Sequence, residues 1–260
     1  DELRRGRPAV HRRFGTPLAI LAGDGLLFAA FEQVARCAER GVPARAVQQA
    51  VGVLAAAGRD MAEGVARELG WTTTVQGAGC ASALADYAET ARLKTAALLR
   101  ASCEMGALLG GGGARQVRAL AAYGQALGIA FQIRDDLLPY TSTAAREGKP
   151  ADSDLRNARP ALPLVLVGAL GDARARTRLT ALLADDPSAR HEELAALLEE
   201  TGALKQAQVI AQEYALQCHQ ALDDLPPGPH SQVLRDLIAA VTATDDADAD
   251  VPGTDIGRQR

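Results

Sequence analysis

The chain has 260 residues, 48% of them hydrophobic, so it can bury one sizeable core without disulfides. Its net charge of −4 does not provide the strongly basic surface that a phosphate backbone requires, and we therefore expect no nucleic-acid partner. Aromatic residues make up only 3%, while Ala and Leu are abundant, which favours helix over strand. These properties predict an all-α protein.

Four cysteines are scattered without a C-x-x-C spacing, which indicates buried, reduced thiols and a cytoplasmic location. We find no run of about 20 uninterrupted apolar residues and no signal peptide, so we expect no membrane span. The first residue is Asp1 rather than Met, and the polar residues after it resemble the middle of a loop. We therefore expect that further sequence originally preceded Asp1.

Apolar residues at helical spacing predict a series of helices along the chain. The expected helices cover residues 17–39, 44–70, 86–109, 114–138, 162–170, 179–184, 192–200, 203–222 and 231–243. Pro139 is expected to end the helix before it, because proline lacks the backbone N–H and clashes with the preceding turn. Loops are expected at residues 71–79 and 141–160, where Gly, Thr and other polar residues gather.

The end of the chain differs from the rest in composition. From Asp245 onward it is acidic and poor in apolar residues, which is typical of a disordered tail. The sequence therefore predicts one helical domain over residues 1–244 and a disordered acidic tail over residues 245–260.

Asp135 and Asp136 are the most informative pair, because they follow a nearly apolar helix that should be buried. Adjacent carboxylates in such a place repel each other and lose hydration, so something must offset that cost. A divalent cation would do so, and Mg²⁺ typically shares one or two carboxylates with substrate phosphates. Gln132 lies three and four residues earlier and projects toward the same face. A structural alternative is that the pair only caps or frays the helix end, although the helix dipole disfavours acids there.

Cationic residues at two other places fit the same chemistry. Lys94 and Thr95 lie inside an otherwise apolar helix, where a lysine is either snorkelling to water or functional. Arg4 and Arg5 belong to a dense cationic run, which could also be a solvated loop. Paired arginines, separate lysines and metal-binding carboxylates together are what a site that grips two diphosphates would need.

The chain resembles the trans-isoprenyl diphosphate synthases (polyprenyl synthetases) over about residues 1–243, through four segments in a consistent order. Residues 128–138 resemble the family's second aspartate-rich motif, and residues 148–163 resemble the signature after it, with Gly-Lys-Pro and Ser-Asp. Residues 93–95 resemble the central K-T motif. Residues 3–11 resemble the stretch that follows the first aspartate-rich motif, and that first motif itself is absent from the chain.

The resemblance implies an all-α isoprenoid synthase bundle around a deep central cavity, assembled as a homodimer. It implies that Mg²⁺ assists ionisation of an allylic diphosphate, which then condenses with isopentenyl diphosphate and loses a proton. The expected product is a longer polyprenyl diphosphate. General resemblance to medium-chain enzymes of the family favours geranylgeranyl diphosphate. An apolar cavity would keep water from the carbocation while cations hold the diphosphate charge.

The resemblance also implies a role for each matched residue. The Mg²⁺ ligands would be Asp135 and Asp136, with Asp135 the more direct one. Thr95 and Gln132 would line the reacting centre, where their dipoles ease a transient cation. The expected diphosphate-binding residues are Lys94, Lys149, Arg159 and Arg4 for the allylic diphosphate and Arg5 for isopentenyl diphosphate, and Lys94, Thr95, Gln132 and Lys149 form the expected catalytic set.

Two departures from the family pattern leave alternatives open. Pro139 stands where the motif normally has its last aspartate, which keeps the metal pair but removes an outer carboxylate. If the natural protein began at Asp1, Mg²⁺ would have one wall instead of two and we would expect little or no condensation. If the chain is part of a longer polypeptide, as its non-methionine start favours, we expect an ordinary synthase.

Two other functions are compatible with parts of the sequence. One is a non-catalytic partner subunit of a heteromeric prenyl synthase, which the Pro139 change favours mildly and the retained Asp135, Asp136, Lys94 and Lys149 disfavour. The other is a class I terpene cyclase, whose usual N-D-x-x-S-x-x-x-E motif is not found in this sequence.

Overall fold

The computed structural model describes residues 2–4, 7–70, 80–141, 161–184 and 190–242. These residues are almost entirely helical, so the predicted all-α class is confirmed. Among these residues the strands are confined to a small hairpin, in which β1 (Leu3–Arg4) and β2 (Arg7–Pro8) pair antiparallel. The hairpin residues are exposed, so they show no alternation of apolar and polar residues that would predict strands.

Most of the predicted helices are confirmed, several of them to within one or two residues. In chain order the observed helices are α1 (Val10–Phe14), which was not predicted, α2 (Thr16–Arg36), η1 (Cys37–Arg40), α3 (Ala44–Gly70), α4 (Cys80–Ala91), η2 (Arg92–Ala96), α5 (Ala97–Leu109), α6 (Ala114–Thr141), α9 (Leu162–Leu170), α10 (Ala173–Ala184), α11 (His191–Glu200), α12 (Ala203–Leu222) and α13 (Pro229–Thr242). Helices α4 and α10 begin six residues before the predicted starts, because their first turns carry small or polar residues that add nothing to an apolar pattern.

Helix α6 continues through Pro139 to Thr141, so the predicted end at residue 138 is wrong. Proline lacks a backbone N–H, so the helix loses the one bond that residue 139 would donate within it. The carbonyl oxygen of Pro139 has a partner outside the helix, His191 Nε2 at 2.7 Å. The His191 ring also stacks on Tyr140, with ring centroids 5.6 Å apart. Contacts with α11 therefore hold the last turn of α6 in place.

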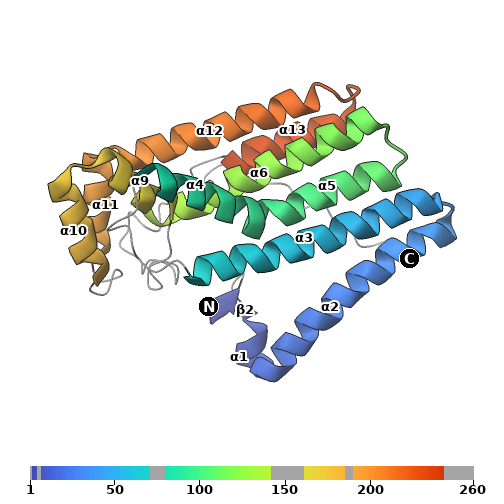
Figure 1. Cartoon of the computed structure of the whole chain (residues 1–260), viewed down its shortest axis with the longest axis horizontal. Helices are drawn as coiled ribbons and strands as arrows, with labels where there is room; N and C mark the ends of the chain where they lie inside the picture. The colour runs from blue at the N-terminus through green and yellow to red at the C-terminus, as the bar shows by residue number, and fades with distance from the viewer. Residues whose placement is uncertain (1, 5–6, 71–79, 142–160, 185–189, 243–260) are drawn as a thin grey trace.

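Figure 1 shows the long helices α3, α5, α6 and α12 side by side along the length of the molecule, each packed against the next. Helix α13 packs on α6 and α12, and α9, α10 and α11 gather at one end of the bundle. Helix α6 lies between α5 and α12 and buries ten residues along its length. The predicted burial of the helix that carries Asp135 and Asp136 is therefore confirmed.

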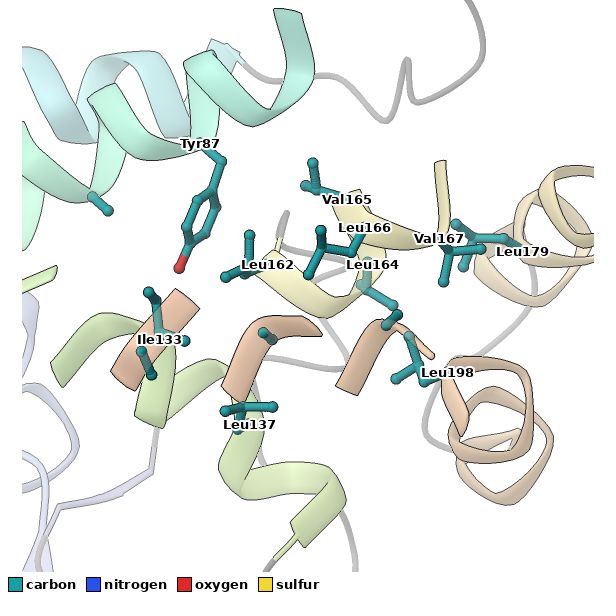
Figure 2. Packing of buried hydrophobic residues seen from close by; sticks show 14 of the residues in the cluster. Tyr87, Ile133, Leu137, Leu162, Leu164, Val165, Leu166, Val167, Leu179 and Leu198 are labelled. Carbon is teal, nitrogen blue, oxygen red and sulfur yellow. The ribbon is translucent and has the colours of Figure 1, made fainter. Parts of the chain in front are cut away.

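The end of the bundle near α9 has its own apolar core. Helix α9 is buried at seven consecutive positions, Leu162 to Gly168. Leucines of α10 and α11 and the α6 residues Ile133 and Leu137 pack around it. Figure 2 shows Tyr87 reaching from α4 into this core beside Ile133 and Leu162. A tyrosine hydroxyl in such a place requires a hydrogen-bond partner.

Glycines allow the helices to approach one another at the backbone. A Cβ built on Gly64 of α3 would lie 2.4 Å from the backbone nitrogen of Lys94. A Cβ built on Gly128 of α6 would lie 2.5 Å from Cα of Ala96. The turn Arg92–Ala96 is therefore held between α3 and α6 with no room for side chains on these two faces.

Helix α2 stands apart from the bundle in Figure 1 and packs mainly on α1 and α3. Its large apolar side chains are exposed: Leu18, Ile20, Leu21, Leu26, Leu27 and Phe28. Within the described residues, the segment Thr16–Arg40 is the one helix whose length and composition would allow it to cross a membrane. The composition of this helix therefore does not support the prediction of no membrane span, because only a few charged residues interrupt its apolar ones.

Several sequence predictions fall wholly or partly outside the described residues. The predicted loop 71–79, nearly all of the loop 141–160 and the tail 245–260 lie there, so the division into residues 1–244 and 245–260 stays a prediction. Among the described cysteines, Cys37, Cys103 and Cys218 are free thiols as predicted, but only Cys218 is fully buried.

The close approach at Gly128 yields a stability prediction. Gly128→Ala should lower the free energy of unfolding by about 1–3 kcal/mol, because its methyl group would overlap the backbone of Ala96. The matched control is Gly58→Ala, an exposed α3 position with no atom within 4 Å of the new Cβ, which should gain about 0.5–1 kcal/mol of helix propensity. Urea denaturation followed by circular dichroism measures both, and equal stability of Gly128→Ala and the parent protein would contradict the close packing.

Candidate active site

The turn Arg92–Ala96 is a π-helical interruption of the long helix that runs from α4 into α5. One extra residue in a turn displaces the side chains that follow, and such turns occur often at functional sites. Lys94 and Thr95, both predicted site residues, lie on this turn. The close contacts with Gly64 and Gly128 fix its backbone from two sides. The turn therefore presents Lys94 and Thr95 in a defined orientation.

Lys94 does not snorkel to water, because its ammonium is paired inside the bundle. Its Nζ lies 2.6 Å from Oε1 of Glu68 on α3, and the two side chains are only 26% and 16% exposed. Glu68 is a residue that the sequence analysis missed. The structure places it four residues after buried Gly64, on the stripe of α3 whose buried residues are three, four or seven positions apart. A carboxylate on a buried stripe indicates a partner on another helix.

Thr95 and Gln132 were both predicted to line a reacting centre, and the structure brings them together. Thr95 Oγ1 donates a hydrogen bond to Gln132 Oε1 over 2.6 Å. Gln132 Nε2 in turn donates to Oδ1 of Asp136, one helical turn further along α6, over 2.9 Å. The π-turn and α6 are thus joined by a continuous polar chain, Thr95–Gln132–Asp136.

The carboxylate of Asp136 is half-buried and accepts hydrogen bonds from three helices. Its Oδ2 accepts from the Tyr87 hydroxyl and from the Leu162 backbone N–H, each at 2.8 Å. Leu162 is the first residue of α9, whose N-terminus has no side-chain cap of its own, so Asp136 caps it from another helix. These donors offset the cost of lost hydration, which the sequence led us to expect a cation to offset. A direct metal contact of Asp136 stays a prediction.

Burial changes the acidity of the groups around this carboxylate. Loss of hydration raises the pKa of Asp136 to about 6, against the hydrogen bonds from Leu162, Tyr87 and Gln132, which lower it. Burial also raises the pKa of Tyr87 well above its usual value, and the nearby Asp136 charge adds to the effect. At neutral pH the carboxylate is therefore mostly ionised and the phenol is protonated, which suits the hydrogen bond between them.

Asp135 differs from its neighbour, because its side chain is exposed. Within the described residues, no group of three or more His, Cys, Asp or Glu side chains could enclose a metal ion by itself. Mg²⁺ often takes only one or two protein carboxylates and fills its other positions with water and phosphate oxygens. The exposed carboxylate of Asp135 fits that manner of binding, and its role as the more direct ligand stays a prediction.

The remaining predicted site residues are only partly described. Arg4 lies on strand β1 and is exposed, and no contact that the structure describes joins it to Lys94 or to the polar chain. Arg5, Lys149 and Arg159 lie outside the described residues. Their predicted roles in binding diphosphate therefore stay predictions.

A cavity of about 390 Å³ lies between α3 and α5, beginning beside Ala97, three residues beyond Lys94. Small residues line much of it, including Gly52, Ala56 and Ala101. Charged residues also reach it, namely Asp60, Arg100 and Glu104. The cavity therefore lies next to the π-turn, and its lining is not uniformly apolar.

The family known as polyprenyl synthetase matches residues 1–201 of this chain. The chain belongs to the polyprenyl synthetase family. It is 33% identical to a short chain isoprenyl diphosphate synthase of Methanothermobacter thermautotrophicus over 86% of its own length and 66% of that protein. It is 38% identical to a farnesyl diphosphate synthase of Geobacillus stearothermophilus over 64% of its own length and 54% of that protein. The chain thus spans between about half and two thirds of these curated relatives.

Solved structures agree with the family assignment and with the predicted bundle. The geranylgeranyl pyrophosphate synthetase of Pyrococcus horikoshii superposes with a TM-score of 0.82 at 31% identity, over 93% of this chain and 72% of that one. The geranylgeranyl pyrophosphate synthase of Corynebacterium glutamicum, crystallised with isoprenyl diphosphate and magnesium, has a TM-score of 0.76 at 25% identity, with 94% and 72% covered. The expected isoprenoid synthase fold is therefore confirmed.

The Lys94–Glu68 pair leads to a binding prediction. If Lys94 holds a diphosphate, Glu68 competes for its ammonium, and Glu68→Gln should tighten binding of Mg²⁺ with inorganic diphosphate about two- to fivefold. Isothermal titration calorimetry measures the affinity. Glu63→Gln, an exposed carboxylate of the same helix, is the matched control and should change nothing. Weaker binding by Glu68→Gln would show instead that Glu68 itself contributes to the metal or diphosphate site.

Proposed function

We propose that the protein is a Mg²⁺-dependent trans-prenyltransferase that condenses isopentenyl diphosphate with an allylic diphosphate. The observation that carries this proposal is the hydrogen-bonded chain that joins Thr95 to Gln132 over 2.6 Å and Gln132 to Asp136, on the same π-turn that carries Lys94. Family membership supports the same reaction class. The match to a relative crystallised with isoprenyl diphosphate and magnesium supports the substrate and the ion.

Each described residue has a distinct task in the proposed reaction. When the allylic C–O bond breaks, its electron pair leaves with the diphosphate, and the Lys94 ammonium holds part of that charge. The oxygen dipoles of Thr95 and Gln132 stabilise the allylic cation. The double bond of isopentenyl diphosphate then attacks the cation, and a proton passes to the departing diphosphate. Among residues not described, Lys149 and Arg159 would also grip the allylic diphosphate.

Asp135 would anchor Mg²⁺, and bound Mg²⁺ would neutralise charge on the diphosphate oxygens. The Arg4 and Arg5 side chains would bind the allylic and the isopentenyl diphosphate, respectively. We keep geranylgeranyl diphosphate as the expected product, although the relatives make products of several lengths, including farnesyl and geranylfarnesyl diphosphate. We also keep the cytoplasm as the expected location.

Elongation assays with the Asp135→Ala variant test the proposal. The full-length protein, incubated with Mg²⁺, isopentenyl diphosphate and labelled allylic diphosphates, should yield longer polyprenyl diphosphates. Asp135→Ala should lower turnover by about two to four orders of magnitude, because a metal contact strengthened in the transition state is lost. Radiochromatography resolves the product lengths.

The same assay distinguishes the alternatives. Cyclic hydrocarbon formed without isopentenyl diphosphate would indicate a terpene cyclase. No activity of the protein alone, with elongation once a second protein is added, would indicate a partner subunit. Asp223→Asn, a substitution on the exposed end of α12, controls for the general loss of a carboxylate. Near-normal elongation by Asp135→Ala would count against the proposed site.

We also propose that a second copy of the protein covers helix α2, giving the predicted homodimer. The exposed side chains of α2 point in nearly all directions around the helix, a distribution typical of a helix that other elements enclose. Asp24 and Glu32 interrupt its apolar length, which favours protein over lipid as the cover. A self-associating apolar helix would also reconcile its membrane-like composition with a soluble enzyme.

Charge placed on α2 tests the dimer. Leu21 and Phe28 are 64% and 72% exposed and lie seven residues apart on one face, so Leu21→Glu with Phe28→Glu should convert the protein to monomers. Leu216→Glu on α12, an exposed leucine away from α2, should leave the dimer intact. Sedimentation velocity reports the assembly state. A monomeric parent protein, or one that binds phospholipid vesicles through α2, would overturn the proposal.

A further inference from the structure

We propose that Asp136 is a positioning residue, whose carboxylate sets the direction of the hydrogen bonds through Gln132 to Thr95 instead of binding the metal. The inference rests on the proposed prenyltransferase function. It assigns the two adjacent aspartates different tasks: Asp135 toward Mg²⁺, and Asp136 toward the polar groups that face a developing cation.

The direction of the chain follows from which groups can only accept hydrogen bonds. An ionised carboxylate has no proton to donate, so Gln132 must present its amide N–H to Asp136 Oδ1, 2.9 Å away. The amide group is planar, so this choice turns Oε1 to the opposite side, where it meets Thr95 at 2.6 Å. An amide oxygen also only accepts, so the Thr95 hydroxyl must donate. Thr95 then has only lone pairs left to offer a cation.

The second oxygen of Asp136 keeps the carboxylate in this orientation. Its Oδ2 accepts from Tyr87 of α4 and from the N–H of Leu162, each at 2.8 Å. Both donors belong to residues that are at most 6% exposed, so neither could find water as a substitute partner. Rotation of the carboxylate toward a metal would leave a buried hydroxyl and the first N–H of α9 without an acceptor.

The variant Asp136→Asn would reverse the donor and acceptor roles along the hydrogen bonds from Asp136 to Thr95, and the side chains would keep their shape. The new amide has one acceptor oxygen, and Tyr87 and Leu162 together require it at the Oδ2 position. Its NH₂ group would then face Gln132, which must turn its own oxygen to meet it. The NH₂ group of Gln132 would point to Thr95, whose hydroxyl would become an acceptor and turn its proton toward the proposed position of the cation. A hydrogen-bond donor would replace a lone pair beside the cation.

Restoring the direction requires a second substitution. With Gln132→Glu added to Asp136→Asn, the carboxylate at position 132 can accept from the new amide and from Thr95 at once. The negative charge has then moved by one helical turn, and the Thr95 hydroxyl donates as it does in the parent protein. A residue that served as a metal ligand or only stabilised the fold would not be rescued in this way.

The test combines turnover with binding of Mg²⁺ and inorganic diphosphate by calorimetry, on the full-length protein at pH 8. Asp136→Asn should lose at least about 100-fold in kcat, and its diphosphate affinity should stay within about threefold of the parent. Asp135→Asn should lose affinity by about tenfold or more. The double variant Asp136→Asn with Gln132→Glu should regain about tenfold or more in kcat over Asp136→Asn.

Three results would overturn the inference: loss of diphosphate affinity in Asp136→Asn equal to that in Asp135→Asn, normal turnover in Asp136→Asn, or no rescue in the double variant. If Asp136→Asn does not fold, Tyr87→Phe serves instead. It removes one donor from Oδ2 and should leave Mg²⁺–diphosphate affinity unchanged, whereas tighter binding would reveal a released metal ligand. A parent protein that neither elongates nor binds Mg²⁺–diphosphate would refute the proposed function itself.

Discussion

The arrangement of the site depends on one carboxylate, that of Asp136, and on the donors that surround it. An acid near the C-terminal end of α6 is disfavoured by that helix, but the same group lies at the N-terminus of α9, where negative charge is favoured. The buried Tyr87 hydroxyl and the Gln132 amide complete its hydrogen bonds. One side chain thereby fixes α4, α6 and α9 relative to one another at the end of the bundle where the predicted chemistry lies.

Close backbone packing brings the other half of the site to this point. Gly64 and Gly128 let α3 and α6 approach the π-turn, so that Lys94 meets Glu68 on one side and Thr95 meets Gln132 on the other. Cationic and polar functions are thus separated by the turn that carries them. Such a separation suits a reaction in which negative charge develops on a leaving diphosphate while positive charge develops a few ångströms away.

Local sequence patterns predicted most of the helices and several of the residues that lie together in the structure, but not their long-range partners. Apolar periodicity located α3, α9 and α12, and the positions of Lys94, Thr95 and Gln132 followed from motifs. Tyr87 was not predicted as a partner of the site, because Asp136, to which it donates, is 49 residues away. Glu68 was missed for the same reason, since Lys94 lies 26 residues further on. The end of α6 was misplaced because His191, which bonds to the Pro139 carbonyl, lies in another helix.

The sequence predicts one cation that offsets the burial of both aspartates, whereas three protein donors already surround Asp136, and Asp135 is the exposed member of the pair. A crystal structure of the full-length protein with Mg²⁺ and a non-hydrolysable allylic diphosphate analogue tests this division most directly. We expect Mg²⁺ bound to an Asp135 oxygen, with Asp136 still accepting from Tyr87, Gln132 and Leu162. An Asp136 oxygen inside the Mg²⁺ coordination sphere, with those hydrogen bonds broken, would contradict the account.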